Sequence, residues 1–315
     1  MKRLIVNADD FGLTRLVNQG ILDAHQNGIV TSTSLMAGGE AFDDAIAMTR
    51  WAVRLSVGVH LVLCQGAPIS PPSEISTLVG EGGKTLWTFN EFLRKLATGH
   101  IDLRQVELEL RRQIVRVIDA GITPSHLDGH KHVHVLPGIA DVVVRLAHEF
   151  RIPRVRCPQE RMPHHILWKG LTSFRAGIFK QYLAGRPISW LAGRLRVKLV
   201  RAGIDSPSHF FGLTQTGFLD ADSLDRILRT LPERSSELMC HPGYPEASLV
   251  KTGTRLIAQR EVECRALISR RIKDRVRGEG IELISYRDLG GAAHSRESTV
   301  PDPIVKSAPG CARPV

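Results

Sequence analysis

The stretch RLIVNADD, residues 3–10, decides the fold because it joins an apolar run to a polar end. Leu4, Ile5 and Val6 predict a buried strand, and the Asn-Ala-Asp-Asp that follows predicts a loop at the strand's carboxyl end. A helical pattern over 15–27 comes next. A strand, a loop and then a helix form the unit from which parallel α/β sheets are built.

The same unit recurs along the whole chain. Further strands are predicted at 31–39, 55–63, 124–129, 153–156, 236–243 and 281–289, and helices at 41–50, 87–99, 103–121, 138–150 and 252–280. Strands that alternate with helices imply βαβ crossovers and a parallel sheet. About seven such units within 315 residues favour a closed or nearly closed (β/α) barrel over an open sheet.

Three segments fall outside this pattern. Residues 65–84 are rich in Pro and Gly and too long for a plain connection, so they are expected to form an active-site loop or lid. Residues 160–205 are expected to form a helical insertion that a plain barrel does not require. Residues 292–315 are expected to be a disordered tail. No composition break requires a second domain, so 1–291 is predicted to be a single barrel domain.

Composition narrows the class of protein. Apolar residues make up 43% of the chain, which is ordinary for a globular protein with a sizeable core. No window approaches the roughly 18–20 uninterrupted apolar residues of a membrane span. No signal-peptide pattern opens the chain, so a cytoplasmic protein is predicted. The five cysteines include no CxxC pair, which argues against a disulfide framework and against a thiolate zinc site.

The net charge of +10 is concentrated in one segment. Between Arg151 and Arg201 there are twelve Lys or Arg residues and one acidic residue, Glu160, so this segment carries a charge of +11. Apolar residues recur at helical spacing over 171–182 and 188–199, which predicts a basic amphipathic helix pair. Two interpretations stay open: an element in peripheral contact with an anionic membrane, and a helical hairpin whose basic face is solvated. No nucleic-acid-binding motif accompanies the charge, so no nucleic-acid partner is expected.

Polar residues that suit catalysis gather at the predicted carboxyl ends of the strands. They come from four segments: Asp9 and Asp10, His60, the group His126, Asp128 and His130, and His241. Taken singly, each has a plainer explanation, such as a helix cap, a hydrogen-bonded core histidine or a turn. Because the carboxyl ends of barrel strands open onto one mouth, the set together predicts a single pocket.

These residue types indicate metal-assisted hydrolysis. One carboxylate and two imidazoles suit Zn²⁺ or another divalent ion and leave positions open for water and substrate. Such an ion lowers the pKa of bound water and polarises a carbonyl oxygen. A second carboxylate can then accept the water proton, and a distant histidine can protonate the leaving group.

Five motifs in order carry a family resemblance: NADDFG (7–12), GVHLVL (58–63), SHLDGHKHVH (125–134), MCHPG (239–243) and SYRDL (285–289). Over about residues 1–290 the chain resembles the YdjC-like carbohydrate deacetylases. The stretches LVLCQGAPISPP (61–72) and SPSHFFGL (206–213) look most like the branch associated with hopanoid biosynthesis. That branch is implicated in removing acetyl from an N-acetylglucosaminyl hopanoid lipid.

The resemblance implies a fold, a reaction and a set of residues. The fold is a deformed parallel (β/α) barrel of seven strands, and the reaction is hydrolysis of an N-acetyl group on an N-acetylglucosamine-type sugar. One divalent ion, Zn²⁺ or Mg²⁺, is expected, with Asp10, His60 and His130 as its ligands. Asp9 is the expected general base and His241 the expected general acid. Four residues of one segment are expected to support the ligands or to bind substrate: His126, Asp128, His132 and His134.

Partners and alternatives follow from the same resemblance. The substrate is expected to be an N-acetylated sugar or a glycolipid, and the protein to be cytoplasmic, with peripheral contact at the inner membrane surface and homo-oligomerisation left open. A barrel amidohydrolase or phosphoesterase with the same metal also stays open, because barrels host many chemistries.

Overall fold

The structure, a computed structural model, describes residues 1–80, 82–160 and 176–290. Its parallel strands form one curled sheet in the order β4-β3-β2-β1-β6-β5, and β7 pairs with the first half of β1. The strands are β1 (Lys2–Phe11), β2 (Ser32–Leu35), β3 (Ser56–Leu61), β4 (Leu127–Gly129), β5 (His209–Phe211), β6 (Arg234–Cys240) and β7 (Glu282–Ile284). The predicted α/β class with parallel strands is confirmed.

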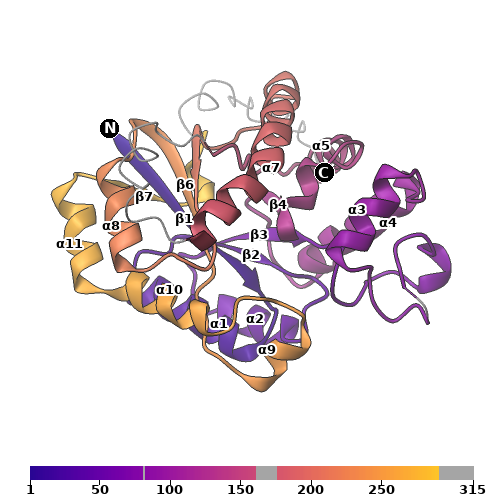
Figure 1. Cartoon of the computed structure of the whole chain (residues 1–315), viewed down its shortest axis with the longest axis horizontal. Coiled ribbons are helices and arrows are strands. Elements are labelled where there is room, and N and C mark those ends of the chain that lie inside the picture. Colours follow the sequence, from indigo (N-terminus) through magenta and orange to yellow (C-terminus); the bar gives the residue numbers. More distant parts are fainter. Residues whose placement is uncertain (81, 161–175, 291–315) are drawn as a thin grey trace, which may run out of the picture.

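Helices surround the strands, with α8 and α11 on one flank and α3 and α4 on the other (Figure 1). The α-helices are α1 (Arg15–Gln26), α2 (Phe42–Thr49), α3 (Phe89–Ala97), α4 (Leu103–Asp119), α5 (Ile139–Glu149), α7 (Ala176–Arg201), α8 (Ala221–Arg229), α9 (Ala247–Lys251), α10 (Ala258–Ile268) and α11 (Arg270–Gly278). Short 3₁₀ segments are η1 (Pro72–Glu74), η2 (His130–Val135) and η3 (Tyr286–Asp288). Among the described residues, no helix is both long and apolar enough to span a membrane.

The sheet is a curled half-barrel with β4 and β5 at its edges, so the closed or nearly closed barrel expected from the sequence is not complete. The predicted strand at 153–156 is reduced to isolated parallel bridges, which join Val155 to Leu127 and Arg154 to Asp205. These bridges continue the curl beyond β4 without forming a ladder. The physical reason is length, since one bridged residue on each side leaves too few hydrogen bonds for a strand pair.

Two helical predictions are also corrected. The pattern over 252–280 predicts one long helix, but the structure divides it into α10 and α11 at Ser269. The Ser269 side chain accepts a hydrogen bond from the Ile272 amide and so caps a new helix start. The basic segment does not form a helix pair separated at Pro187, because α7 runs unbroken through that residue. Residues 161–175 of the predicted insertion and the predicted tail at 292–315 lie outside the described residues.

The core explains why β1 can carry the site. Residues 4–11 of β1 are buried, because the strand lies in the centre of the sheet between β2 and β6. Helix α1 packs closely on the loop after β6: a Cβ on Gly20 would lie 2.4 Å from the Gly243 Cα. Only glycine permits this approach, which fixes the segment that follows Cys240 beside the end of β1.

Candidate active site

The predicted catalytic side chains meet at the carboxyl ends of neighbouring strands. Asp9 and Asp10 lie near the end of β1, His60 near the end of β3, His130 directly after β4, and His241 directly after β6. All five line one cavity of about 730 Å³. The convergence expected from the sequence is therefore present in the fold, and a curled half-barrel is enough to produce it.

The cavity has walls from four further segments. The predicted active-site loop contributes Gln65, Gly66 and Ala67, and α7 contributes Gln181 and Ile188. Residues 251–256 and the loop after β5 also line the cavity. The part of the 65–84 segment that lines the cavity thus lies where an active-site loop would; its movement as a lid stays a prediction.

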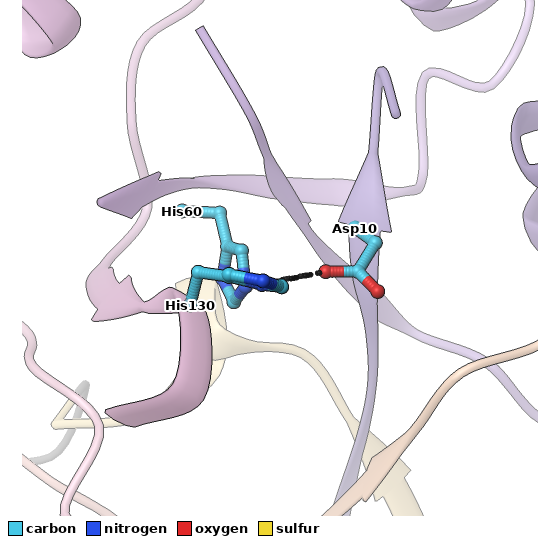
Figure 2. A group of neighbouring side chains, drawn as sticks. All are labelled: Asp10, His60 and His130. Atoms are coloured by element: carbon cyan, nitrogen blue, oxygen red, sulfur yellow. Dashed lines mark hydrogen bonds and ion pairs between the residues drawn. The ribbon is translucent and has the colours of Figure 1, made fainter. Parts of the chain in front are cut away.

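Asp10, His60 and His130 form a compact ligand set (Figure 2). Their ligand atoms lie within 4.8 Å of one another, with His130 Nδ1 at 3.2 Å and His60 Nε2 at 3.5 Å from Asp10 Oδ1. The imidazole rings are 5.6 Å apart at an interplanar angle of 75°, so both nitrogens face the same carboxylate oxygen from different directions. This donor set fits a divalent ion such as Zn²⁺ with open coordination positions.

His60 is oriented by Asp128, which supports the metal assignment. His60 Nδ1 lies 2.8 Å from Asp128 Oδ1, so the other ring nitrogen, Nε2, faces Asp10. Asp128 is fixed in turn by a 2.7 Å hydrogen bond from the Ser34 hydroxyl. Metal-binding imidazoles commonly have such a carboxylate partner, which sets the tautomer and ring direction.

The pKa shifts of His60 and Asp10 indicate that the ligand set favours a positive charge. Burial lowers the pKa of His60, but Asp128 and Asp10 outweigh it and raise the pKa to about 10. In the absence of metal, a proton on His60 therefore balances the carboxylates. Burial raises the pKa of Asp10, yet Arg260, His130 and His60 hold it well below its usual range. An ion bound here would replace the proton, because metal ligation requires a deprotonated imidazole.

Asp10 also has an unusual backbone. Its φ of 70° is in the left-handed region, which costs a non-glycine residue conformational energy. Arg260 Nη2 donates a 2.5 Å hydrogen bond to Asp10 Oδ2, which leaves Oδ1 toward the two histidines. Strain of this kind concentrates at functional sites, so the backbone independently marks Asp10.

Asp9 is held by a buried arginine. Arg156 Nη1 and Nη2 each donate a 2.7 Å hydrogen bond to the Asp9 carboxylate, and the Asn7 amide donates a third at 2.9 Å. Arg156 Nε also donates to Glu237 Oε1 at 2.8 Å. The result is a carboxylate with a fixed direction at the cavity wall, next to the ligand set.

A second group, Asp9, His60 and Asp128, also brings three ligand atoms within 4.8 Å of one another. Here Arg156 already pairs with both carboxylates, at 2.7 Å from Asp128 Oδ2 and 2.7 Å from Asp9. Its guanidinium supplies the positive charge that an ion would bring. The geometry therefore favours the group with Asp10 and His130 as the metal site.

His241 is anchored by its backbone alone. Its amide donates a 2.6 Å hydrogen bond to Glu263 Oε2, while its buried Nδ1 has no hydrogen-bond partner among the described residues. Burial lowers the pKa of His241 to about 4, despite the opposing effect of Asp9 and Asp10. The imidazole is therefore neutral near pH 7 in the substrate-free protein.

The remaining histidines of the 125–135 segment occupy three different environments. His126 lies beneath the site and stacks on Tyr286 with ring centres 3.7 Å apart. His134 contacts the Arg156 carbonyl through Nε2 at 3.2 Å. His132, which has a φ of 57°, lines the cavity, and its buried Nδ1 has no hydrogen-bond partner among the described residues. The assignment of these residues to ligand support or substrate binding stays a prediction.

Sequence reasoning missed the arginines that organise the site. It counted Arg156 within the basic segment, but the side chain is fully buried among carboxylates and adds nothing to surface charge. It also overlooked Arg260 and Glu263, which lie inside a helical pattern with no local sign of a site. A usable signal existed for Glu237, an acid within the otherwise apolar end of β6.

Comparison with known proteins shows the family of this chain. The model of the family described as "YdjC-like protein" matches residues 3–278, which contain every residue of the site. The chain belongs to the YdjC-like family. The match includes both the proposed metal ligands and the buried arginines, so the family comparison covers the whole candidate site.

Several known proteins are similar to this chain over nearly their full length. A carbohydrate deacetylase of Thermoanaerobacter pseudethanolicus is 28% identical over 92% of this chain and 100% of its own. A chitooligosaccharide deacetylase of Escherichia fergusonii is 34% identical over 91% of this chain and 98% of its own. A crystal structure from Enterococcus faecalis, of a protein proposed to cleave cellobiose phosphate, superposes with a TM-score of 0.72 at 26% identity. That superposition covers 90% of this chain and 97% of the other.

Proposed function

We propose that this protein is a metal-dependent carbohydrate N-deacetylase that acts on an N-acetylglucosamine-type sugar. The observation that carries the proposal is the arrangement of Asp9, fixed by Arg156, beside the Asp10, His60 and His130 ligand set. Deacetylase relatives that span the whole chain support the reaction type. The bound metal, the role of Asp9 as base and the role of His241 as acid are parts of the same proposal.

A divalent ion held by Asp10, His60 and His130 would supply Lewis-acid polarisation of the acetamide carbonyl and a more acidic water. Asp128 keeps His60 in the ligating tautomer, and Arg260 keeps one oxygen of Asp10 directed at the histidines. These contacts fix the ligands before any substrate binds, which is the preorganisation that efficient hydrolysis requires.

Asp9 accepts a proton from the attacking water, whose oxygen forms a bond to the acetyl carbon. The hydrogen bonds from Arg156 and Asn7 leave this carboxylate only a narrow range of directions, so it is positioned as a general base without reorganisation. The C–N bond then breaks, and the products are acetate and the free amine of the sugar.

His241 protonates the departing amine. Because its lowered pKa leaves it neutral before the reaction, it must first receive the proton that Asp9 accepts from the water. Its imidazole lines the cavity, and its buried Nδ1 forms no hydrogen bond in the described part of the chain. Asp9 and His241 thus form the two ends of one proton transfer.

The hopanoid-linked glycolipid is the proposed physiological substrate. The resemblance of 61–72 and 206–213 to the hopanoid-associated branch supports it. The cavity gives a second support, because apolar side chains line much of it: Leu13, Met36, Phe89, Ile188, Leu213 and Leu256. A sugar alone would not need so much apolar contact, whereas the lipid end of a glycolipid would.

Mass spectrometry of reaction products tests the proposal. Zn²⁺-loaded or Mg²⁺-loaded protein is incubated with an N-acetylglucosaminyl lipid, with N-acetylated chito-oligosaccharides and with phosphate esters. We expect loss of one acetyl group from the sugar substrates, with Asp9→Asn as the matched inactive control. Phosphate release without acetate release would replace the proposal with a phosphoesterase.

A further inference from the structure

One face of α7 exposes large apolar side chains to solvent. Leu183, Trp190 and Val197 are 51%, 60% and 50% exposed, and they recur every seven residues. Seven residues make almost two helical turns, so these three side chains lie in one line along the helix. Val200 lies beside this line and is 74% exposed. Single exposed apolar residues are ordinary, but a line of them on one helix is not.

The same face carries arginines between the apolar side chains. Arg186, Arg194 and Arg201 are exposed and continue the line in steps of three or four residues. The Arg194 guanidinium lies 4.1 Å over the Trp190 ring, which holds the two side chains together. Within the described ranges, none of these three arginines forms an ion pair, and α7 contains no acidic residue. We call this face, residues 183, 186, 190, 194, 197 and 201, the outer stripe of α7.

The opposite face of α7 belongs to the protein interior. Gln181 and Ile188 line the catalytic cavity, and Leu195 is buried in the core. Each of these positions comes two residues before one of the apolar members of the outer stripe, Leu183, Trp190 and Val197. Two residues turn the helix by about 200°, so the two sets lie on opposite faces. Figure 1 shows the carboxyl-terminal part of α7 at the upper edge of the molecule. One helix therefore separates the cavity from whatever the outer stripe contacts.

We propose that the outer stripe of α7 docks the protein on the surface of an anionic lipid bilayer. Arginines at headgroup level gain from the negative surface potential, while Trp, Leu and Val enter the boundary with the acyl chains. The stacked Trp190 and Arg194 present an apolar ring and a positive charge at one place, as side chains at a membrane interface do. The outer stripe would form the contact with the bilayer. The opposite face of α7 lines the cavity, which therefore lies behind the helix.

Two other occupants fit the stripe less well. A nucleic acid would pair with the arginines but would leave Leu183 and Val197 in contact with phosphates. A second copy of this chain would bring two unpaired basic faces together, which costs energy by like-charge repulsion. An anionic bilayer alone satisfies both the charge and the apolar line.

This docking deepens the proposed function without depending on it, since vesicle binding needs no catalysis. If the substrate is a lipid-linked acetylated sugar, docking through α7 brings the cavity within reach of the sugar at the bilayer surface. The lipid binding and the deacetylation can then fail or succeed separately in experiment.

Vesicle co-sedimentation of the full chain tests the proposal. The probes are vesicles of phosphatidylcholine alone and of phosphatidylcholine mixed with phosphatidylserine, at low and at high salt. We expect binding only to the anionic vesicles and release at high salt. Arg186→Glu with Arg194→Glu should weaken binding at least about tenfold, because each arginine near the surface contributes about 1 kcal/mol. Trp190→Ala should also weaken it.

The chain offers matched controls on another surface. Trp51 is 83% exposed near the start of β3, and Arg50 and Arg54 flank it. Trp51→Ala, and Arg50→Glu with Arg54→Glu, make the same chemical changes and should leave vesicle binding unchanged. Acetate release from a soluble chito-oligosaccharide should be the same in all these variants.

Three results with vesicles would overturn the docking assignment. They are absence of wild-type binding to anionic vesicles at low salt, equal loss in the Trp51-side variants, and retained binding in the α7 variants. Preferential binding of the wild type to a nucleic acid over the vesicles would likewise reject it. A loss of acetate release together with intact vesicle binding would contradict the proposed function and leave the docking proposal standing.

Discussion

The two residues proposed to move protons come from neighbouring strands, yet the protein holds them in different ways. Asp9 on β1 receives hydrogen bonds from Arg156 and Asn7, so its carboxylate is fixed. His241 after β6 is anchored by its amide to Glu263, and its Nδ1 lacks a partner in the described part of the chain. The base is thus preorganised by the protein, whereas the acid has its side chain available to the substrate. Substitutions should therefore affect the two residues in different ways.

The largest effect is expected for Asp9→Asn. Removing the base should lower kcat by about 10²–10⁴-fold while metal is still bound. It should also lower the free energy of unfolding, because the buried Arg156 loses one of its carboxylate partners. Steady-state kinetics, metal analysis and urea denaturation measure the three quantities. Near-wild-type kcat in Asp9→Asn with full metal occupancy would remove Asp9 from the mechanism.

The second effect is expected for His241→Ala. We expect a fall in kcat of about 10²-fold, because water in the cavity can partly replace the acid. Since the His241 Nδ1 has no protein partner, the free energy of unfolding should change less than in Asp9→Asn. A smaller loss of stability in His241→Ala than in Asp9→Asn would support the difference in how the two side chains are held. Equal losses of stability would contradict it. Added imidazole should restore part of the His241→Ala activity.

A smaller effect is expected for Asp128→Asn. Asp128 orients His60 through a 2.8 Å contact, and loss of such a partner typically weakens metal binding about 10–100-fold. Titration calorimetry with Zn²⁺ measures the affinity. Glu237→Gln is the matched control, since Glu237 contacts Arg156 and Tyr286 but no proposed ligand. An unchanged Zn²⁺ affinity in Asp128→Asn would separate Asp128 from the metal site.

The smallest effect is a pH dependence of stability in the metal-free protein. The folded-state pKa of His60 is raised from 6.5 to about 10, so its contribution is fully present below pH 6.5 and is lost as pH rises through about 10. Thermal unfolding from pH 6.5 to 10 should therefore show a falling Tm without metal. The fall should disappear with Zn²⁺ bound and in His60→Gln. A fall of the same size in His60→Gln would assign it to another group.

The sequence predicts well that these polar side chains lie at strand ends, and the reason is local; their role as metal ligands stays a prediction. Asp10 and His60 each come at the end of an apolar run, and His130 directly follows the short strand 127–129, so their position at a strand end can be inferred from a few neighbouring residues. Parallel strands then bring those ends together without any knowledge of pairing order. This is why a curled half-barrel, in place of the predicted closed or nearly closed barrel, leaves the expected convergence intact.

The supporting arginines could not be predicted in the same way. Arg156 lies 147 positions from Asp9, and Arg260 lies 250 positions from Asp10, so no local pattern links either pair. An arginine in a basic segment looks like surface charge until its burial is known. The break between α10 and α11 was missed for a related reason, because the Ser269 cap interrupts a pattern that otherwise continues as a helix.

The central claim is that one metal ion and a fixed Asp9 together hydrolyse an N-acetyl group. The most direct measurement is a Zn²⁺ titration of metal-stripped protein during acetate release from N-acetylated chito-oligosaccharide, in wild type and in Asp9→Asn. The account predicts that wild-type activity rises until one ion is bound per chain, while Asp9→Asn binds the same ion and stays almost inactive. Full acetate release by the metal-stripped protein, or by metal-loaded Asp9→Asn, would contradict it.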